Sequence, residues 1–254
     1  MRRSRAPEGR PMPADPVVAD LAERGFAVIP RLIDAEAAGA VAAAVERATA
    51  AAATLRREGT VYGMRDLLRG VPEVRALAAS RPVLDRVGAI LGPGAFAVRG
   101  LWFDKTPDAN WGVPWHQDLT IAVAERRDAP GFGPWTVKAG IPHVRPPVDV
   151  LRGMVTVRIH LDDCGATDGP LRVVPGSHAD GRLDVEAARA WLGRGDAVDC
   201  LVDRGGAVLM RPLLLHSSSA ATAPDRRRVV HLEYAAAPLP GGLAWFEAVG
   251  GAGP

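Results

Sequence analysis

Cysteine and lysine are both scarce in this chain of 254 residues. The two cysteines, Cys164 and Cys200, lack C-x-x-C spacing and are too few for a disulfide framework, so a reduced, cytoplasmic setting is expected. Only two of the 31 basic residues are lysines, Lys105 and Lys138, and the formal net charge is +2. A charge balance this even excludes the broad basic field that nucleic-acid binding requires.

Long apolar runs are also missing. No stretch of about 18 apolar residues exists, so no membrane-spanning segment is expected. The basic N-terminus, MRRSRAPEGRPMP, is not followed by an apolar stretch, which argues against a signal peptide. Residues 1–14 lack periodicity and are expected to be disordered. The apolar content of 48% predicts one domain over residues 15–254.

The first third of the chain predicts helices. Residues 16–25 form a short helical pattern that ends at Gly25, and a short β-type run follows at 26–30. Asp34 is placed to cap an alanine-rich helix over 35–53. A further helix is expected over 82–91, ending at Gly92.

From Ala95 onward the pattern changes to short β-like runs separated by turn residues. Many short strands at this spacing predict a sandwich, a jelly roll or a barrel. The expected fold class is therefore mainly β with flanking helices, in which an N-terminal helical layer packs on a β-barrel. The expected strands lie at 96–103, 114–123, 153–161, 171–174, 197–202, 206–211 and 227–236.

One long segment, residues 125–151, interrupts this rhythm. It is rich in proline and glycine and carries Phe132 and Trp135. Loops of this length within a compact domain are usually functional or disordered. Aromatic side chains in a loop indicate that the loop packs over another part of the protein. We therefore expect this segment to form a lid over the active site, with a proline-rich surface excursion as the alternative.

A His-x-Asp pair on a strand directs an imidazole and a carboxylate to the same side, because residues i and i+2 share a face. With a third ligand from a facing strand, two histidines and a carboxylate form the iron site of non-haem Fe(II) oxygenases. The chain contains three such pairs. They are His116/Asp118, His160/Asp162 and His178/Asp180.

These pairs are not equivalent. His178/Asp180 follows Pro-Gly-Ser, which indicates a surface turn. His160/Asp162 ends a strand-like run and is a genuine competitor. The number of strands between each pair and the distal histidine, His216, favours His116/Asp118, because the other choice leaves the run at 114–123 without a role.

The region after His216 suggests a partner for a dicarboxylate. Three consecutive arginines, 226–228, precede the last strand-like run. A dicarboxylate cosubstrate that chelates iron through its keto-acid end needs a buried cation for its far carboxylate. Arginine suits this role because it offers two parallel N–H donors, and the Ser218 hydroxyl is a possible second contact. The pattern alone does not say which of the three arginines faces inward.

At this point the residues resemble a known family. The segment 103–118, with its VPWHQD motif, resembles the phytanoyl-CoA dioxygenase family, and so do the stretches GFAVI at 25–29 and GPLRVVPGSH at 169–178. The block 216–228 resembles the family's distal histidine and arginine. The resemblance therefore runs over most of the chain from about residue 20.

The resemblance implies a double-stranded β-helix, which is a cupin-like jelly roll. It implies Fe(II) bound by His116, Asp118 and His216, with 2-oxoglutarate and O2 as cosubstrates. It further implies that Arg227 holds the far carboxylate of 2-oxoglutarate, with Ser218 beside it. Many relatives carry an asparagine shortly after the distal histidine, where this chain has three serines. The implied reaction is hydroxylation of a C–H bond in a small molecule, with release of succinate and CO2.

Candidates for substrate contact follow from strand alternation. Thr156, Arg158 and His160 share one face of a predicted strand. If this face lines the cavity, Arg158 and His160 could bind a polar or anionic substrate; if it faces solvent, they have no such role. Trp135 and Lys138 of the expected lid are weaker candidates.

Two other functions fit the same scaffold. One is a cupin-type metal enzyme whose substrate binds the metal directly and that does not use 2-oxoglutarate. The other is a non-catalytic small-molecule-binding protein. Arg227 favours the oxygenase over the cupin-type enzyme, which needs no cation at the far wall. The intact set of His116, Asp118 and His216 argues against a non-catalytic protein. Neither the substrate nor the oligomeric state can be read from the sequence.

Overall fold

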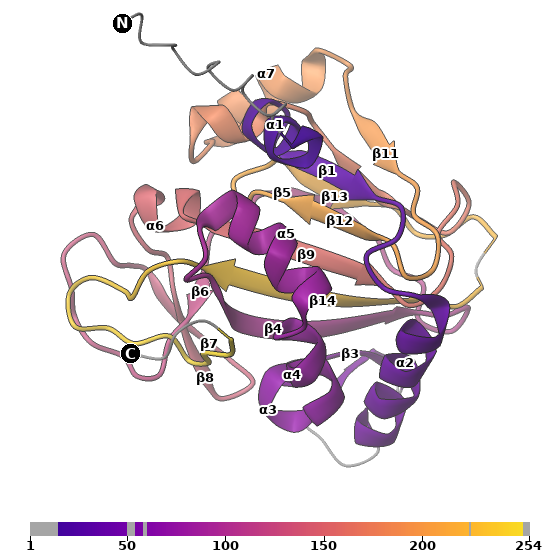
Figure 1. The fold of residues 1–254 in the computed structure, drawn as a ribbon. Helices are drawn as coiled ribbons and strands as arrows, with labels where there is room; N and C mark the ends of the chain where they lie inside the picture. The colour runs from indigo at the N-terminus through magenta and orange to yellow at the C-terminus, as the bar shows by residue number, and fades with distance from the viewer. Residues whose placement is uncertain (1–14, 50–53, 58–59, 224, 251–254) are drawn as a thin grey trace, which may run out of the picture.

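Two antiparallel β-sheets form the centre of the molecule (Figure 1). The computed structural model describes residues 15–49, 54–57, 60–223 and 225–250. The helices are α1 (Pro16–Glu23), α2 (Ala35–Thr49), α3 (Leu67–Gly70), α4 (Pro72–Ala78), α5 (Arg81–Leu91), α6 (Val148–Arg152), the 3-10 turn η1 (Ser177–Asp180) and α7 (Val185–Gly193).

The three longest strands lie side by side at the centre of the large sheet, and the other strands are short. They are β1 (Phe26–Ile29), β2 (Thr54–Arg57), β3 (Thr60–Met64), β4 (Phe96–Lys105), β5 (Val113–His116), β6 (Ile121–Ala122), β7 (Trp135–Lys138), β8 (Ile141–Val144), β9 (Met154–His160), β10 (Leu171–Val173), β11 (Val198–Cys200), β12 (Ala207–Met210), β13 (His216–Ser218) and β14 (Arg227–Ala235).

The large sheet has the strand order β1-β12-β9-β14-β4-β3-β2, and the small sheet has the order β11-β10-β13-β5. A third sheet, β6-β8-β7, lies beside them. This arrangement confirms the expected fold class, a double-stranded β-helix with helices on one side. No described helix combines the length and the apolar character needed to cross a bilayer.

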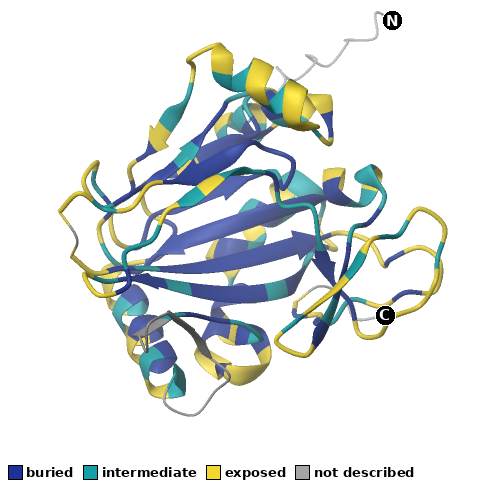
Figure 2. Ribbon diagram, turned by 180° about the vertical axis from the view of Figure 1, so that it is seen from behind, coloured by how far each residue is buried: buried dark blue, intermediate teal, exposed yellow. Residues whose placement is uncertain are grey.

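The large sheet has an apolar outer face and an inner face that carries polar side chains on its central strands. Val230 and Leu232 of β14 point outward and form a core with Val157 of β9 and with the helices α2, α4 and α5. Residues of opposite parity, such as His231, face the small sheet. Figure 2 shows these central strands as the most buried part of the molecule. The helices thus seal one face, while the other face carries polar side chains on the central strands and apolar ones, Val208 and Met210, on β12.

Most of the predicted elements are confirmed. The helix α1 ends before Gly25, whose φ of +80° only glycine adopts readily, and Asp34 caps α2 by accepting a hydrogen bond from the Ala37 N–H at 2.7 Å. The helix α5 ends at Gly92 as expected. Both cysteines are buried and free. The expected disorder of residues 1–14 lies outside the described residues.

Two expectations need correction. The run 114–123 is not one strand, because it breaks after His116 and resumes only at β6. The segment 125–151 is not an irregular loop, since it folds into the β7–β8 hairpin and α6, and Phe132 and Trp135 pack on an apolar cluster with Val144. Its role as a lid stays a prediction.

A buried carboxyl group lies at one end of the large sheet. Glu247 is 5% exposed, and neither of its carboxylate oxygens has a hydrogen-bond partner among the described residues. Burial, followed by the nearby Asp66, raises the pKa of Glu247 above its ordinary value of 4.5. The folded protein therefore holds this side chain neutral at a pH where the unfolded chain ionises it.

The substitution Glu247→Gln should make the protein less sensitive to mildly alkaline pH. The stability that is fully present below pH 4.5 is lost as the pH rises toward the raised folded-state pKa. Over this range the unfolded chain ionises Glu247 whereas the folded protein keeps it neutral. We expect Glu247→Gln to raise the free energy of unfolding at pH 8.5, relative to wild type, by on the order of 1–2 kcal/mol, with a smaller gain at pH 5. Denaturant titrations at both pH values measure this. Glu125→Gln, at an exposed carboxylate, is the matched control; an equal gain at both pH values would contradict the assignment.

Candidate metal centre

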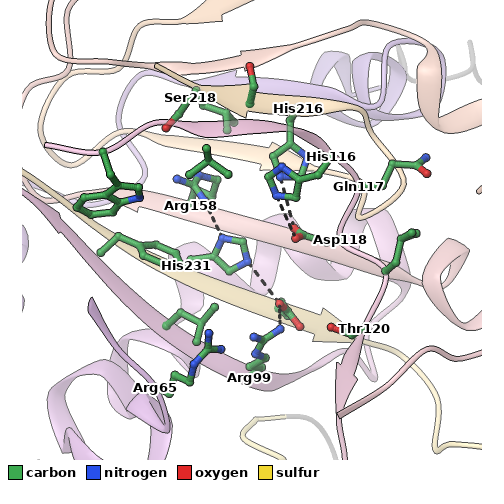
Figure 3. A pocket seen from close by; sticks show the side chains of 18 of the residues that line it. Arg65, Arg99, His116, Gln117, Asp118, Thr120, Arg158, His216, Ser218 and His231 are labelled. Carbon is green, nitrogen blue, oxygen red and sulfur yellow. Dashed lines mark hydrogen bonds and ion pairs between the residues drawn. The ribbon is translucent and has the colours of Figure 1, made fainter. Parts of the chain in front are cut away.

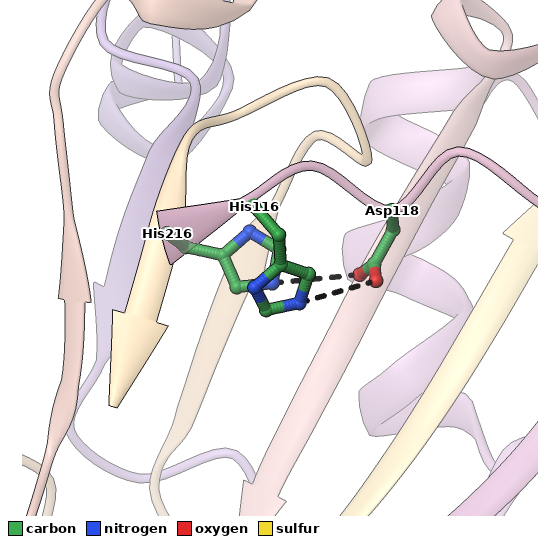
Figure 4. Close-up of side chains that lie close together, drawn as sticks. All are labelled: His116, Asp118 and His216. Atoms are coloured by element: carbon green, nitrogen blue, oxygen red, sulfur yellow. Dashed lines mark ion pairs between the residues drawn. The ribbon is translucent and has the colours of Figure 1, made fainter. Parts of the chain in front are cut away.

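Three side chains converge between the two sheets, two from the paired strands β5 and β13 and one from just beyond β5. The strand β13 pairs with β5 so that His216 lies directly opposite His116. Asp118 lies just beyond β5, where its backbone N–H donates to Pro212 O at 2.9 Å. One ligand atom of each of the three side chains lies within 4.8 Å of the others (Figure 4). Among the described residues, this is the one such group of potential metal ligands.

Both imidazoles are oriented by the same local contact. The Nδ1 atom of His116 lies 2.8 Å from Pro114 O, and Nδ1 of His216 lies 2.8 Å from Leu214 O. A carbonyl oxygen only accepts, so each Nδ1 carries the proton and each Nε2 keeps a free lone pair. Both Nε2 atoms point toward Asp118, and a backbone hydrogen bond on the opposite nitrogen is typical of metal-binding histidines.

The Asp118 carboxylate completes the group. Its oxygens lie 3.8 Å from His116 Nε2 and 3.7 Å from His216 Nε2, too far for hydrogen bonds. Oδ2 is buried and has no hydrogen-bond partner among the described residues. Two ligands that each lie about 2 Å from one ion are at most about 4 Å apart, so this spacing fits a shared metal better than a hydrogen-bonded network.

The protonation states also suit a metal ion. Burial by itself would raise the pKa of Asp118, but the surrounding imidazoles, led by His216, outweigh it and hold this pKa at about 2. Burial lowers the pKa of His216 to about 4, although Asp118 opposes the shift. At neutral pH the site therefore offers an anionic carboxylate and a neutral imidazole, the forms in which these groups bind metals.

The competing His-x-Asp pairs do not form such a group. Asp162 is held by Arg228, whose backbone N–H and Nε each donate to it at 2.8 Å. His178 lies in the turn η1, and its Nε2 is 3.3 Å from the Ala22 carbonyl oxygen. The structure thus brings His216 to the first pair and to neither of the others.

A cavity of about 400 Å³ opens from these three side chains into the space between the two sheets (Figure 3). Strands β4, β9 and β14 of the large sheet form its floor, and β5 and β13 form its roof. Beyond the three candidate ligands it is lined by Arg65, Arg99, Leu101, Phe103, Trp111, Val113, Gln117, Leu119, Thr120, Lys138, Arg158, Leu171, Ser217, Ser218, Arg227, His231 and Glu233.

The far wall of the cavity is cationic. Arg227 is 3% exposed, and its Nη1 donates to Gly169 O at 2.8 Å. Its Nε is buried without a hydrogen-bond partner among the described residues, and the Arg227 side chain lines the cavity. Lys105, directly opposite Arg227 on β4, donates to Ser218 Oγ at 3.1 Å. Burial, followed by the charge of Arg227, lowers the pKa of Lys105 to about 7.

The neighbouring arginines have other partners. Strand alternation turns Arg228 to the outer face, where it pairs with Asp162 and with Glu46. Arg226 pairs with Glu46 and with Asp104. Only Arg227 of the three lines the cavity. The other two are not simply solvated, because each is held by two carboxylates.

A chain of polar contacts crosses the cavity floor (Figure 3). Arg158 Nη1 lies 2.9 Å from His231 Nδ1, and His231 Nε2 lies 3.5 Å from Glu233 Oε1. Glu233 in turn accepts from Arg99 Nη1 at 2.8 Å. The chain joins three strands of the large sheet and fixes the orientation of Arg99.

The candidate substrate residues separate into two pairs. Arg158 and Lys138 line the cavity, so the polar face of β9 points inward rather than to solvent. His160 is 1% exposed but does not line the cavity, and both of its ring nitrogens lack partners among the described residues. Trp135 also lies outside the cavity, because its ring packs on an apolar cluster next to Arg126. The structure therefore does not support substrate contact by His160 or Trp135.

Several cavity residues were not predicted from the sequence. His231 and Glu233 share the parity of Arg227, so strand alternation could have identified them once Arg227 was placed. Arg99 follows similarly from alternation along β4, and so does Lys105, which lies beside the cavity lining. Arg65 comes directly after β3, a strand with no clear pattern, and the sequence contains no signal for it.

Comparison with known proteins gives one family. The model of the family described as Phytanoyl-CoA dioxygenase (PhyH) matches residues 21–229. This range contains all three candidate ligands and Arg227. No curated protein matches the sequence.

Solved structures share the fold at low sequence identity. EctD from S. alaskensis, solved with 2-oxoglutarate and 5-hydroxyectoine, is 19% identical with a TM-score of 0.69, covering 92% of this chain and 79% of its own. SnoK, a non-heme alpha ketoglutarate dependent carbocyclase from nogalamycin biosynthesis, is 20% identical with a TM-score of 0.67, covering 91% and 88%. AviO1 from Streptomyces viridochromogenes Tue57 is 21% identical with a TM-score of 0.64, covering 91% and 97%.

The substitution His216→Ala should abolish tight metal binding. Loss of one of three ligands is expected to weaken Co(II) binding at least about 100-fold, measured by calorimetric titration of the metal-free protein. His178→Ala is the matched control, because His178 belongs to a His-x-Asp pair of the same spacing outside the site. Wild-type affinity in His216→Ala, or an equal loss in His178→Ala, would refute the assignment.

Proposed function

The chain belongs to the phytanoyl-CoA dioxygenase family, and from this premise we propose that it is an Fe(II)- and 2-oxoglutarate-dependent hydroxylase of a small metabolite. The observation that carries the proposal is the convergence of His116, Asp118 and His216 at one end of a cavity whose other end holds the buried, partly unpartnered Arg227. Residues 15–254 act as one domain in this proposal.

The described residues fit the two groups that this chemistry needs. Iron would be held by the two Nε2 atoms and the Asp118 carboxylate, and the lowered pKa values of Asp118 and His216 favour the forms of these two groups that bind a metal. The far carboxylate of 2-oxoglutarate would be held by the Arg227 guanidinium together with Ser218. When bound, Fe(II), 2-oxoglutarate and O2 supply an oxidant that hydroxylates a C–H bond, with release of succinate and CO2.

The protein's own contribution is orientation and charge matching. Arg227 is fixed by its hydrogen bond to Gly169 O, and Lys105 adds a second positive charge near Ser218. A preorganised guanidinium loses little freedom when it binds a carboxylate, which favours a dicarboxylate of defined length. Gln117, between two ligands, turns away and donates to Gly181 O at 2.8 Å. This contact anchors the segment that carries Asp118.

The apolar part of the wall has a separate role. Leu101 and Phe103 of β4 lie on the floor, and Trp111 and Val113 lie near the roof. Apolar walls limit the water near the reacting carbon and strengthen the electrostatic interactions around it. The hydroxylated carbon would therefore be held against this apolar surface.

Two measurements test the proposal. Anaerobic addition of 2-oxoglutarate to the Fe(II)-loaded protein should produce a visible charge-transfer absorption, because the keto acid chelates the metal. Succinate release in air, screened against a metabolite library, should then identify the substrate. Iron binding without the absorption band and without succinate release would favour the cupin-type enzyme or the binding protein instead.

The substitution Arg227→Gln should weaken 2-oxoglutarate binding specifically. Removing a buried charge partner costs about 2 kcal/mol or more, which corresponds to an increase of about 30-fold or more in Kd. Metal affinity should stay near the wild-type value. Arg226→Gln removes the adjacent guanidinium, which lies outside the cavity, and should change this Kd by less than about twofold. The same loss in both variants would show that Arg227 is not the cosubstrate contact.

A further inference from the structure

The cavity carries more positive charge than the proposed chemistry uses. Its lining includes five cationic side chains, and only two carboxylates, Asp118 and Glu233, oppose them. A bound Fe(II) ion and the dianion of 2-oxoglutarate cancel each other's charge. With the histidines neutral, three positive charges in the lining therefore remain unmatched. The five cationic residues are Arg65, Arg99, Lys138, Arg158 and Arg227.

The unmatched positive charge is concentrated on the cavity wall away from Arg227. Arg99 is paired with Glu233, but Arg65 has no hydrogen bond to any described residue, and Lys138 donates only to the Thr120 hydroxyl, at 3.1 Å. Figure 3 shows Arg65 next to Arg99, below the candidate metal ligands. These cations come from three different elements, since Arg65 follows β3, Arg99 lies on β4 and Lys138 ends β7.

The three side chains are close enough to repel one another. Burial, followed by the charge of Arg99, lowers the pKa of Arg65. Burial also lowers the pKa of Lys138, and the charges of Arg99 and Arg65 add to this effect. Converging cations that are partly removed from water are costly unless an anion lies between them.

Two carboxyl groups behind this wall, those of Asp66 and Glu247, do not neutralise the surplus positive charge. Asp66 and Glu247 border a smaller cavity that shares Arg65 and Arg99 with the main one. Because the pKa of Glu247 is raised to about 8, Glu247 adds little negative charge at neutral pH, and Asp66 can match at most one of the three positive charges. At least two positive charges therefore face the main cavity without a counterion among the described residues.

We propose that Arg65, Arg99 and Lys138 form a subsite that binds the carboxylate or phosphate of a small anionic substrate. The inference rests on the proposed function and names the substrate class. The anionic group lies against these three cations, on the opposite side of the cavity from Arg227. The rest of the molecule extends over Leu101 and Phe103 toward the metal.

The size of the cavity limits this substrate. About 400 Å³ has to accommodate 2-oxoglutarate as well, so the space left suits a small metabolite and not a whole coenzyme A thioester. The subsite also separates the roles of two anions. Arg227 and Ser218 select the cosubstrate, whereas the subsite selects the substrate.

Probe binding to the loaded protein tests the subsite. Zn(II) replaces iron to prevent turnover, and saturating 2-oxoglutarate occupies the Arg227 wall. The probes are benzoate, phenyl phosphate and the neutral isostere benzamide, titrated by ligand-observed NMR. In the wild-type protein, at least one of the two anions should bind about tenfold or more tightly than benzamide. The anion that binds more tightly distinguishes a carboxylate from a phosphate.

Matched variants show whether the named residues are responsible. The double substitution Arg65→Gln with Lys138→Gln should reduce the preference for the anion to less than about threefold. Arg126→Gln removes an exposed arginine near the same hairpin, outside the cavity, and should keep the wild-type preference. The 2-oxoglutarate affinity should be unchanged in both variants, because neither affects the ligands or Arg227, and neither variant should lower the temperature of thermal unfolding.

The outcomes separate the two proposals. Equal binding of anions and benzamide to the wild-type protein, or an anion preference that survives in the double variant, would overturn the subsite while 2-oxoglutarate binding still supports the oxygenase. Failure of the Zn(II)-loaded wild-type protein to bind 2-oxoglutarate would refute the proposed function, and the subsite with it.

Discussion

The pairing of β13 with β5 is the contact on which the site depends. It places His216 opposite His116, and the backbone hydrogen bond from Asp118 to Pro212 O brings the carboxylate to the same point. Each imidazole is fixed by a carbonyl two residues before it, so the lone pairs face inward before any ligand arrives. A shift of one residue in this register would turn His216 away from its partners. The candidate metal centre is therefore a consequence of strand register.

The two faces of the large sheet explain how a folded protein tolerates the charged cavity. The outer face, with Val157, Val230 and Leu232, buries apolar surface against the helices and provides much of the stability. The inner face can then hold Arg158 and Arg227 in an orientation that costs free energy without a ligand. In the proposed function, anion binding at each end of the cavity would offset this cost and would link the stability of the site to its ligands.

The sequence predicted features with local signals and missed those without them. Asp34 and Gly92 mark helix ends through their own chemistry, and the His-x-Asp spacing identified His116 and Asp118. Strand alternation does not place Asp118, however, because β5 ends at His116 and the backbone hydrogen bond to Pro212 O holds Asp118 beside it. The β7–β8 hairpin was missed because its turn, Ala139-Gly140, has alanine at φ +52°, where asparagine or aspartate would give a recognisable signal. Arg65 was missed because its position depends on the packing of β3 beside β4.

The most direct test of the account is anomalous diffraction at the iron edge from crystals grown anaerobically with Fe(II) and 2-oxoglutarate. The account predicts one iron peak between the Nε2 atoms of His116 and His216 and the carboxylate of Asp118. It also predicts that the far carboxylate of 2-oxoglutarate contacts Arg227. An iron peak elsewhere, or a cosubstrate that points away from Arg227, would contradict it.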